Sequence, residues 1–200
     1  MSDITFEKLT GPAAAARLEA MANLRLTVFR EFPYLYDGSR AAELAYLRTY
    51  ADSPGGCVIL ARDGRKIVGA ITGIPLQNET EDFTAPFRAR GWDLASLYYV
   101  GELLFLPPWR GRGLGTRLLA LLEEHVRALG TLRYLACATV ERPPDHPLRP
   151  VDFIPIERFC ERQGFVKHPE LSCRVCWREL DGVRSPKSMV FWIKGLAIGG

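Results

Sequence analysis

Two hundred residues, 48% of them hydrophobic, suffice for a sizeable core, so the sequence predicts a single domain over residues 1–200. The 26 Lys and Arg residues against 23 Asp and Glu leave a net charge of +3, which gives no reason to expect a nucleic-acid or membrane partner. No apolar run approaches the length of a membrane span and the N-terminus lacks an export signal, so we expect a cytoplasmic protein.

The first half of the chain predicts two helices followed by a hairpin. Apolar residues recur at helical spacing over residues 13–31, where Pro33 stops the run, and again over residues 41–50. Two β-branched runs, CVILAR and KIVGAITGI, then flank Asp63-Gly64-Arg65, which is a strong hairpin signal. The stretch NETEDFTAPFRARG predicts a loop and a short helix.

In the second half, strands and helices alternate. SLYYVGELLFL predicts a buried strand that ends at Pro107, and a helix with a broad apolar face follows from Leu114 until Gly130 caps it. LRYLACATV predicts a further strand, and residues 153–163 a short helix capped by Gly164. Two last strands are expected in LSCRVCWREL and KSMVFWIKGL, so the whole order favours a mixed α/β sheet.

The five cysteines are expected to be reduced, because they are odd in number and mostly stand among apolar neighbours. Cys173 and Cys176 have the spacing of a metal knuckle. No second pair exists and the three histidines are scattered, so we expect no metal and place the two thiols on opposite faces of a strand.

The stretch PPWRGRGLGTRLL, residues 107–119, puts three glycines between a strand and a helix. It lacks the lysine of a P-loop, and Leu118 stands where GxGxxG needs its last glycine. Glycines have no side chain to block their backbone N–H groups, and these groups lie at the positive end of a helix. Such a turn is nevertheless suited to bind an anion. We therefore expect a pyrophosphate here.

RGRGLG fits the pattern R/Q-x-x-G-x-G/A, with Arg110, Gly113 and Gly115 in the fixed positions. The strand before it, the amphipathic helix after it, the next strand and the short helix ending in RQGF follow in the same order as in the GNAT acetyltransferase superfamily. The chain resembles that superfamily over nearly its whole length. The resemblance implies a mixed, mostly antiparallel sheet with a splayed pair of parallel strands, flanked by helices.

The resemblance also implies acetyl-CoA as co-substrate. The pyrophosphate would lie on the turn, and the pantetheine arm would pair with the preceding strand, whose N–H groups would hold the thioester oxygen. The cofactor residues implied are Leu103, Leu104, Phe105, Arg110, Gly111, Arg112, Gly113, Leu114, Gly115 and Thr116.

Two residues are candidates for proton transfer, because only the neutral amine attacks a thioester and the departing thiolate needs a proton. Carboxylates at or near the position of Glu102 often act as the base in the family, while the alternative is a solvated or ion-paired carboxylate. Cys160 stands where many members have a tyrosine acid. It is either that acid or a packed core thiol, and an acyl-cysteine route is a further alternative.

The acceptor side is predicted from segments that border the acceptor cleft in the resembled fold: Tyr34, Tyr36, Glu79, Glu81, Asp82 and Asp152. Acidic and phenolic groups favour a cationic amine. Alternatively, the acidic run NETED only opens a helix, since carboxylates stabilise helix N-termini.

The sequence thus predicts an N-acetyltransferase that transfers acetyl from acetyl-CoA to a primary amine by direct attack in a ternary complex. A non-catalytic acyl-CoA-binding or regulatory protein of the same fold is the alternative. A nucleic-acid module built on Arg110, Arg112 and Arg117 is a third reading. The acceptor is a small molecule or a peptide, and the oligomeric state, including a homodimer, stays open.

Overall fold

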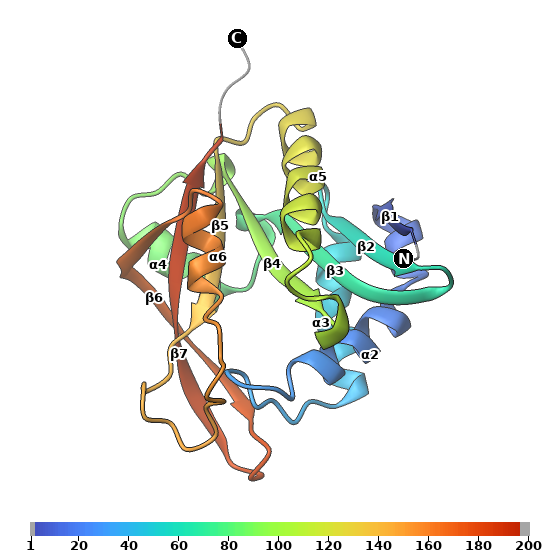
Figure 1. Ribbon diagram of the computed structural model, residues 1–200. Helices are drawn as coiled ribbons and strands as arrows, with labels where there is room; N and C mark the ends of the chain where they lie inside the picture. Colours follow the sequence, from blue (N-terminus) through green and yellow to red (C-terminus); the bar gives the residue numbers. More distant parts are fainter. Residues whose placement is uncertain (1–2, 197–200) are drawn as a thin grey trace.

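One mixed sheet organises the computed structural model, which describes residues 3–196. Its strand order is β1-β2-β3-β4-β5-β7-β6, and every neighbouring pair is antiparallel except β4 and β5 (Figure 1). The strands described are β1 (Ile4–Leu9), β2 (Cys57–Asp63), β3 (Lys66–Pro75), β4 (Leu97–Phe105), β5 (Tyr134–Val140), β6 (Val166–Arg178) and β7 (Arg184–Gly195). This architecture confirms the predicted fold class.

Helices cover both faces of the sheet. They are α1 (Gly11–Ala15), α2 (Leu18–Val28), α3 (Arg40–Asp52), α4 (Glu81–Ala89), α5 (Leu114–Ala128) and α6 (Glu157–Arg162), with short 3-10 turns η1 (Leu76–Asn78), η2 (Leu94–Ser96) and η3 (Pro107–Trp109). Helices α5 and α6 lie in front of the sheet in Figure 1, with α2, α3 and α4 behind it. None of the helices within residues 3–196 has both the length and the hydrophobicity that a membrane span requires.

Strands β4 and β5 form the parallel pair, and they part soon after they meet. Their pairing runs only from Leu97 opposite Tyr134 to Tyr99 opposite Ala136. Beyond that point β4 continues along β3, and β5 continues along β7. The sheet therefore opens into a V between the two strands, as the resemblance implied (Figure 1).

A bulge in β4 lies just beyond this point. Thr72 of β3 is opposite Glu102, but the next residue of β3, Gly73, is opposite Val100, so Gly101 is the extra residue. A Cβ on Gly101 would lie 1.9 Å from the hydroxyl oxygen of Tyr50 in α3. Glycine at this position lets α3 approach the strand.

Several element boundaries differ from the prediction. The helix expected over residues 13–31 is two helices, because Arg17 has a non-helical ψ near 0°, and the second ends at Val28. Strand β1 was missed, since its sequence ITFEKL alternates too weakly to stand out. Strand β6 starts at Val166 rather than 171, because its first residues pair with β7 before a shift in register between His168 and Ser172.

Candidate active site

The glycine turn follows β4 directly and leads into α5. Gly111 and Gly113 have φ of 71° and 76°, a left-handed conformation that other residues rarely adopt, and Gly113 is the N-cap of α5. Two of the three glycines are thus required by the backbone. Gly115 lies within the first turn of the helix.

Space for a ligand is open above this turn. A Cβ built on Gly111 or on Gly113 would meet no atom within 4 Å. The first N–H groups of α5, those of Leu114, Gly115 and Thr116, have no acceptor within the helix and carry the positive end of its dipole. The turn therefore fits the pyrophosphate expected there.

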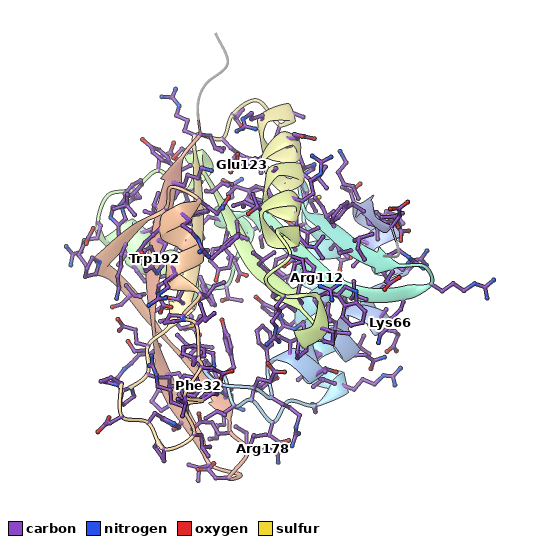
Figure 2. The ribbon with its side chains drawn as sticks, viewed as in Figure 1. Phe32, Lys66, Arg112, Glu123, Arg178 and Trp192 are labelled. Carbon is purple, nitrogen blue, oxygen red and sulfur yellow. The ribbon has the colours of Figure 1, made fainter. Side chains whose placement is uncertain are left out.

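The cationic side chains around the turn differ in the contacts that they already make with the protein. The Arg110 guanidinium donates to the Phe105 carbonyl at 2.8 Å and to the Glu31 carboxylate at 2.6 Å, so framing an anion would require it to exchange these contacts. Arg112 is exposed at the turn, below α5 in Figure 2. The Lys66 ammonium lies 4.8 Å from the ring centre of Trp109, at the start of the same turn. Arg112 and Lys66 form no ion pair within residues 3–196, so both are available to an anion on the turn.

Glu102 lies in the β4 bulge with its carboxylate turned toward α2 and α3. One oxygen accepts from the guanidinium of Arg25, and the other accepts from the hydroxyl of Thr72. Its side chain is only 1% exposed. Burial raises the pKa of Glu102, and the neighbouring Arg25 and the Thr72 hydroxyl partly offset that effect.

Three further side chains of α3 extend this cluster. Glu43 also binds Arg25. Tyr46 and Tyr50 donate to Glu79 at 3.3 Å and 3.1 Å, and the backbone N–H of Thr80 donates to the same carboxylate at 2.7 Å. We call Arg25, Glu43, Thr72, Glu79 and Glu102, with these two tyrosines, the buried carboxylate network.

The predicted Tyr34 and Tyr36 lie on the segment between α2 and α3, and this segment crosses to the far half of the V. The Tyr34 carbonyl accepts from Arg142 at 3.0 Å and from the Trp177 indole at 3.0 Å. Tyr36 forms an isolated bridge with Glu179. Figure 2 shows Phe32 and Arg178 in the lower part of the molecule, where β4 and β5 have parted.

Both tyrosines are tuned by their surroundings. The Tyr34 ring packs 4.4 Å from Phe29 and 6.0 Å from Trp177, and its burial raises its pKa well above the usual range. Burial and the neighbouring Glu43 carboxylate raise the pKa of Tyr36 to about 12. Both phenols stay protonated at neutral pH and can donate hydrogen bonds.

Cys160 is buried on α6, and its sulfur lies 4.0 Å from that of Cys137 on β5. All five cysteines are free. The Cys160 contact and burial raise the pKa of Cys137 well above its usual range, so that thiol keeps its proton. Cys173 is buried and Cys176 exposed on β6, as expected for opposite faces of a strand.

Two predicted acceptor residues lie apart from the network. Asp82 is exposed in the first turn of α4, beside Glu81, which pairs with Arg88 instead. Asp152 is exposed in the connection before α6 and forms no hydrogen bond within residues 3–196. Of the acidic run NETED, only Glu79 is therefore buried beside the tyrosines of α3, and Glu81 and Asp82 open a helix.

Four residues of this region were not predicted from the sequence: Arg25, Glu43, Thr72 and Cys137. A signal existed for the first two. Arg25 falls on the buried stripe of α2, four residues after Met21, and Glu43 precedes Leu47 and Tyr50 on the buried stripe of α3. A charge in an apolar stripe requires a buried partner.

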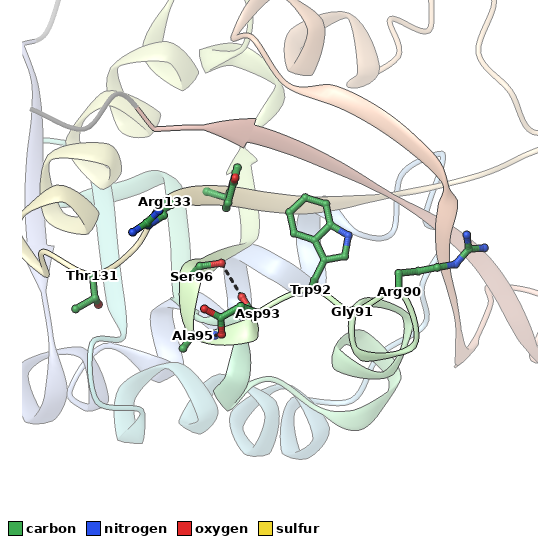
Figure 3. Close-up of a pocket in the computed structure, with 9 residues that line it drawn as sticks. Arg90, Gly91, Trp92, Asp93, Ala95, Ser96, Thr131 and Arg133 are labelled. Atoms are coloured by element: carbon green, nitrogen blue, oxygen red, sulfur yellow. Dashed lines mark hydrogen bonds between the residues drawn. The ribbon is translucent and has the colours of Figure 1, made fainter.

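A separate surface pocket of about 590 Å³ lies at the other end of α5, between the residues that precede β4 and those that precede β5 (Figure 3). Its lining is polar and exposed for the most part, and Figure 3 shows Arg90 turned away from Arg133. The Ser96 hydroxyl within it donates to the Asp93 carbonyl at 2.6 Å. The glycine turn and the network are not part of this pocket.

Comparison with known proteins decides the family. A model described as the acetyltransferase (GNAT) family matches residues 18–149, which span α2 to the connection before α6. The chain belongs to this family. As a GNAT protein it is an acetyl-CoA-dependent acyltransferase by family, and the matched range includes Glu102 and the glycine turn but not Cys160. No curated protein matches the chain.

Solved structures agree with the GNAT fold at low sequence identity. The polyamine N-acetyltransferase of Drosophila melanogaster has a TM-score of 0.63 at 16% identity, over 97% of this chain and 100% of the other. The yncA structure from Salmonella typhimurium, which holds its cofactor acetyl-CoA, has 0.61 at 13%, over 100% and 96%. NAA60 of Arabidopsis thaliana, solved with a bisubstrate analogue, has 0.59 at 12%, over 97% and 99%.

Proposed function

We propose that this GNAT protein transfers acetyl from acetyl-CoA to a primary amine by direct attack in a ternary complex, with Glu102 as the base. The observation that carries the proposal is the position of Glu102. Its carboxylate lies in the bulge of β4, just beyond the last β4–β5 pair, where the sheet opens between the glycine turn and the segment with Tyr34.

The proposed acetyl-CoA site is argued from the glycine turn. Acetyl-CoA supplies the acetyl group as a thioester. The N–H groups of residues 111–116 would hold its pyrophosphate, with Arg112 and Lys66 as the nearby cations. The β4 backbone at residues 103–105 would offer N–H groups to the thioester oxygen as charge builds on it. Open space above Gly111 and Gly113 supports this placement.

Glu102 removes the proton from the acceptor ammonium. Its two oxygens each accept one hydrogen bond from the described residues, and a carboxylate oxygen has room for a second. Because the side chain is buried, the proton reaches it through a water rather than by direct contact with the amine. The nitrogen lone pair then bonds to the carbonyl carbon and the carbon–sulfur bond breaks. The nitrogen releases its second proton to water as the amide forms.

The departing thiolate takes a proton, and Cys160 is the candidate donor on the opposite side of the V. Replacing Cys160 separates its roles. If it is the acid, Cys160→Ala lowers turnover while Cys160→Ser keeps part of it. If the thiol only packs in the core, both variants keep most of the activity. Wild-type rates in Cys160→Ser would exclude an acyl-cysteine intermediate.

A cationic acceptor fits the charge of the site. The buried carboxylate network has three carboxylates against one guanidinium, and the phenols of Tyr34 and Tyr36 stay protonated. The acceptor panel should therefore begin with agmatine, because the Drosophila enzyme forms N-acetylagmatine. Polyamines, peptide N-termini and aminoglycosides complete it.

Calorimetry with CoA and acetyl-CoA, followed by release of free CoA thiol with this panel, tests the function. Binding together with acceptor-dependent thiol release is the expected result. Binding without thiol release for any amine would favour the non-catalytic acyl-CoA-binding protein. Absence of CoA binding would overturn both.

A further inference from the structure

The charges of the buried carboxylate network do not balance. Arg25, Glu43, Glu79 and Glu102 are between 1% and 8% exposed, and among them one cation faces three carboxylates. A buried carboxylate without a partner is costly, so such a group binds a proton or shares a cation. The arrangement around Arg25 decides which carboxylate keeps its charge.

Arg25 is held in one place by four contacts. Its Nε donates to Glu43 and its Nη1 donates to Glu102. The guanidinium also lies 4.8 Å from the ring centre of Phe29 and 4.7 Å from that of Tyr46. These contacts leave the guanidinium little freedom, so it links a carboxylate of α3 to the carboxylate in the β4 bulge.

We propose that Arg25 and Glu43 are positioning residues that set the charge of Glu102 in opposite directions. This inference rests on the proposed role of Glu102 as base. Arg25 favours the charged carboxylate and aims it by a direct hydrogen bond. Glu43 accepts a hydrogen bond from the same guanidinium and its charge repels that of Glu102, so it favours the protonated form of Glu102.

Other groups face Glu102 from every element packed against it, and they stay constant in the test below. The Thr72 hydroxyl of β3 donates to it, and Glu79 after η1 raises its pKa by repulsion. Tyr46 and Tyr50 of α3 and Tyr34 of the preceding segment complete the set. None of these binds Arg25 through a hydrogen bond among the described residues.

The test compares two variants that should shift the titration of Glu102 in opposite directions. In Glu43→Gln the whole charge of Arg25 acts on Glu102, so the acidic limb of the pH profile of kcat/KM shifts to lower pH. In the double variant Arg25→Met/Glu43→Gln the cation is lost and Met still fills the space between the rings, so the limb shifts to higher pH. Each shift should be about one pH unit or more.

Glu123→Gln is the matched control. Glu123 is also a buried carboxylate that binds cations, Arg127 at 2.8 Å and Lys194 at 2.5 Å, but it lies on α5. Its pH profile should match that of the wild type. Circular dichroism of each variant confirms folding, and Glu43→Gln keeps the test decisive if the double variant does not fold.

A second readout does not depend on turnover. Glutamate labelled with carbon-13 at the side-chain carboxyl reports the titration of Glu102 by NMR, with Glu102→Gln assigning the signal. Opposite shifts in both readouts support the inference. Turnover with an unmoved limb and an unmoved titration overturns it while the proposed function stands. Opposite NMR shifts in a folded protein that acetylates no amine support the coupling and overturn the proposed function.

Discussion

The glycine turn and the buried carboxylate network lie at the two ends of the same strand segment, yet they are built in opposite ways. The turn is exposed and works through its backbone, with residues that follow one another from Gly111 to Thr116. The network is buried and works through side chains, and its central contact joins Arg25 to Glu102 across 77 residues. The first depends on local conformation, whereas the second depends on the packing of α2 and α3 against β4.

This difference predicts different failures. A substitution in the turn should weaken cofactor binding and leave the core intact. A substitution in the network should change the chemistry or the stability and leave cofactor binding intact. The following variants test that division.

The largest effect is expected at Glu102. Glu102→Gln keeps the shape but removes the base, so kcat should fall by about 10²- to 10⁴-fold at neutral pH. The loss should be smaller at high pH, where the amine is already neutral. Steady-state kinetics across pH measure it, and calorimetry should show unchanged CoA binding.

Exposed Glu141, which pairs with Lys167 at 3.3 Å, provides the control, and Glu141→Gln should leave kcat unchanged. Unchanged activity in Glu102→Gln at every pH would remove Glu102 from the mechanism.

Gly101→Ala should have the largest effect on stability. The new Cβ would lie 1.9 Å from the Tyr50 hydroxyl, so α3 or the strand must move. Overpacking of this kind costs about 1–3 kcal/mol of unfolding free energy. Chemical denaturation measures it, and the shift of Tyr50 should also lower turnover.

Gly195→Ala is the matched strand variant, because a Cβ there would meet nothing within 4 Å and should be close to neutral. Equal stability of the two variants would contradict the close approach of α3 to the bulge.

A comparison of the glycines at the two ends of α5 distinguishes an effect on ligand binding from an effect on backbone strain. Gly113 and Gly130 have φ of 76° and 80°, and a Cβ on either would meet no atom within 4 Å. Both alanine variants should lose about 1 kcal/mol of stability through strain. Only Gly113→Ala should also weaken CoA binding, by about tenfold, as measured by calorimetry. Equal CoA affinity in the two variants would contradict a cofactor on the turn.

Most of the fold was predictable because its signals are local. The hairpin at Asp63-Gly64-Arg65, the buried strand β4, the glycine turn and the amphipathic helix α5 each follow from short-range periodicity or turn chemistry. The break at Arg17 and the extension of β6 to Val166 were not, since they depend on what the segments pack against.

The site divides in the same way. Glu102 was predicted as the base because the family resemblance implies a carboxylate at or near this place on the strand. Its partners could not be predicted, because Arg25 and Glu43 come from separate helices that meet only in the folded chain. Asp82 and Asp152 were grouped with the acceptor residues by segment, and the structure places both outside the network. Their role in acceptor binding stays a prediction.

The smallest effect is expected on the pH dependence of stability, through the cost of burying the charge of Glu79. Burial raises the pKa of Glu79 above its ordinary value of 4.5, although the Thr80 N–H and the hydroxyls of Tyr50 and Tyr46 oppose that effect. The folded protein therefore holds this proton to higher pH than the unfolded chain does. Stability from this group is present below about pH 4.5 and is lost as the pH rises through the raised pKa.

Glu79→Gln removes this dependence. The substitution also has an effect that does not depend on pH, because the amide replaces an oxygen that accepts from the Thr80 N–H at 2.7 Å. The difference in unfolding free energy between the variant and the wild type should nevertheless change in favour of the variant between pH 4.5 and neutral pH. The change should be about 1.4 kcal/mol for each pH unit by which the pKa of Glu79 is raised. Denaturant titrations at the two pH values measure the gain. The exposed Glu124→Gln on α5 should show none, and a gain of the same size there would place the effect outside the network.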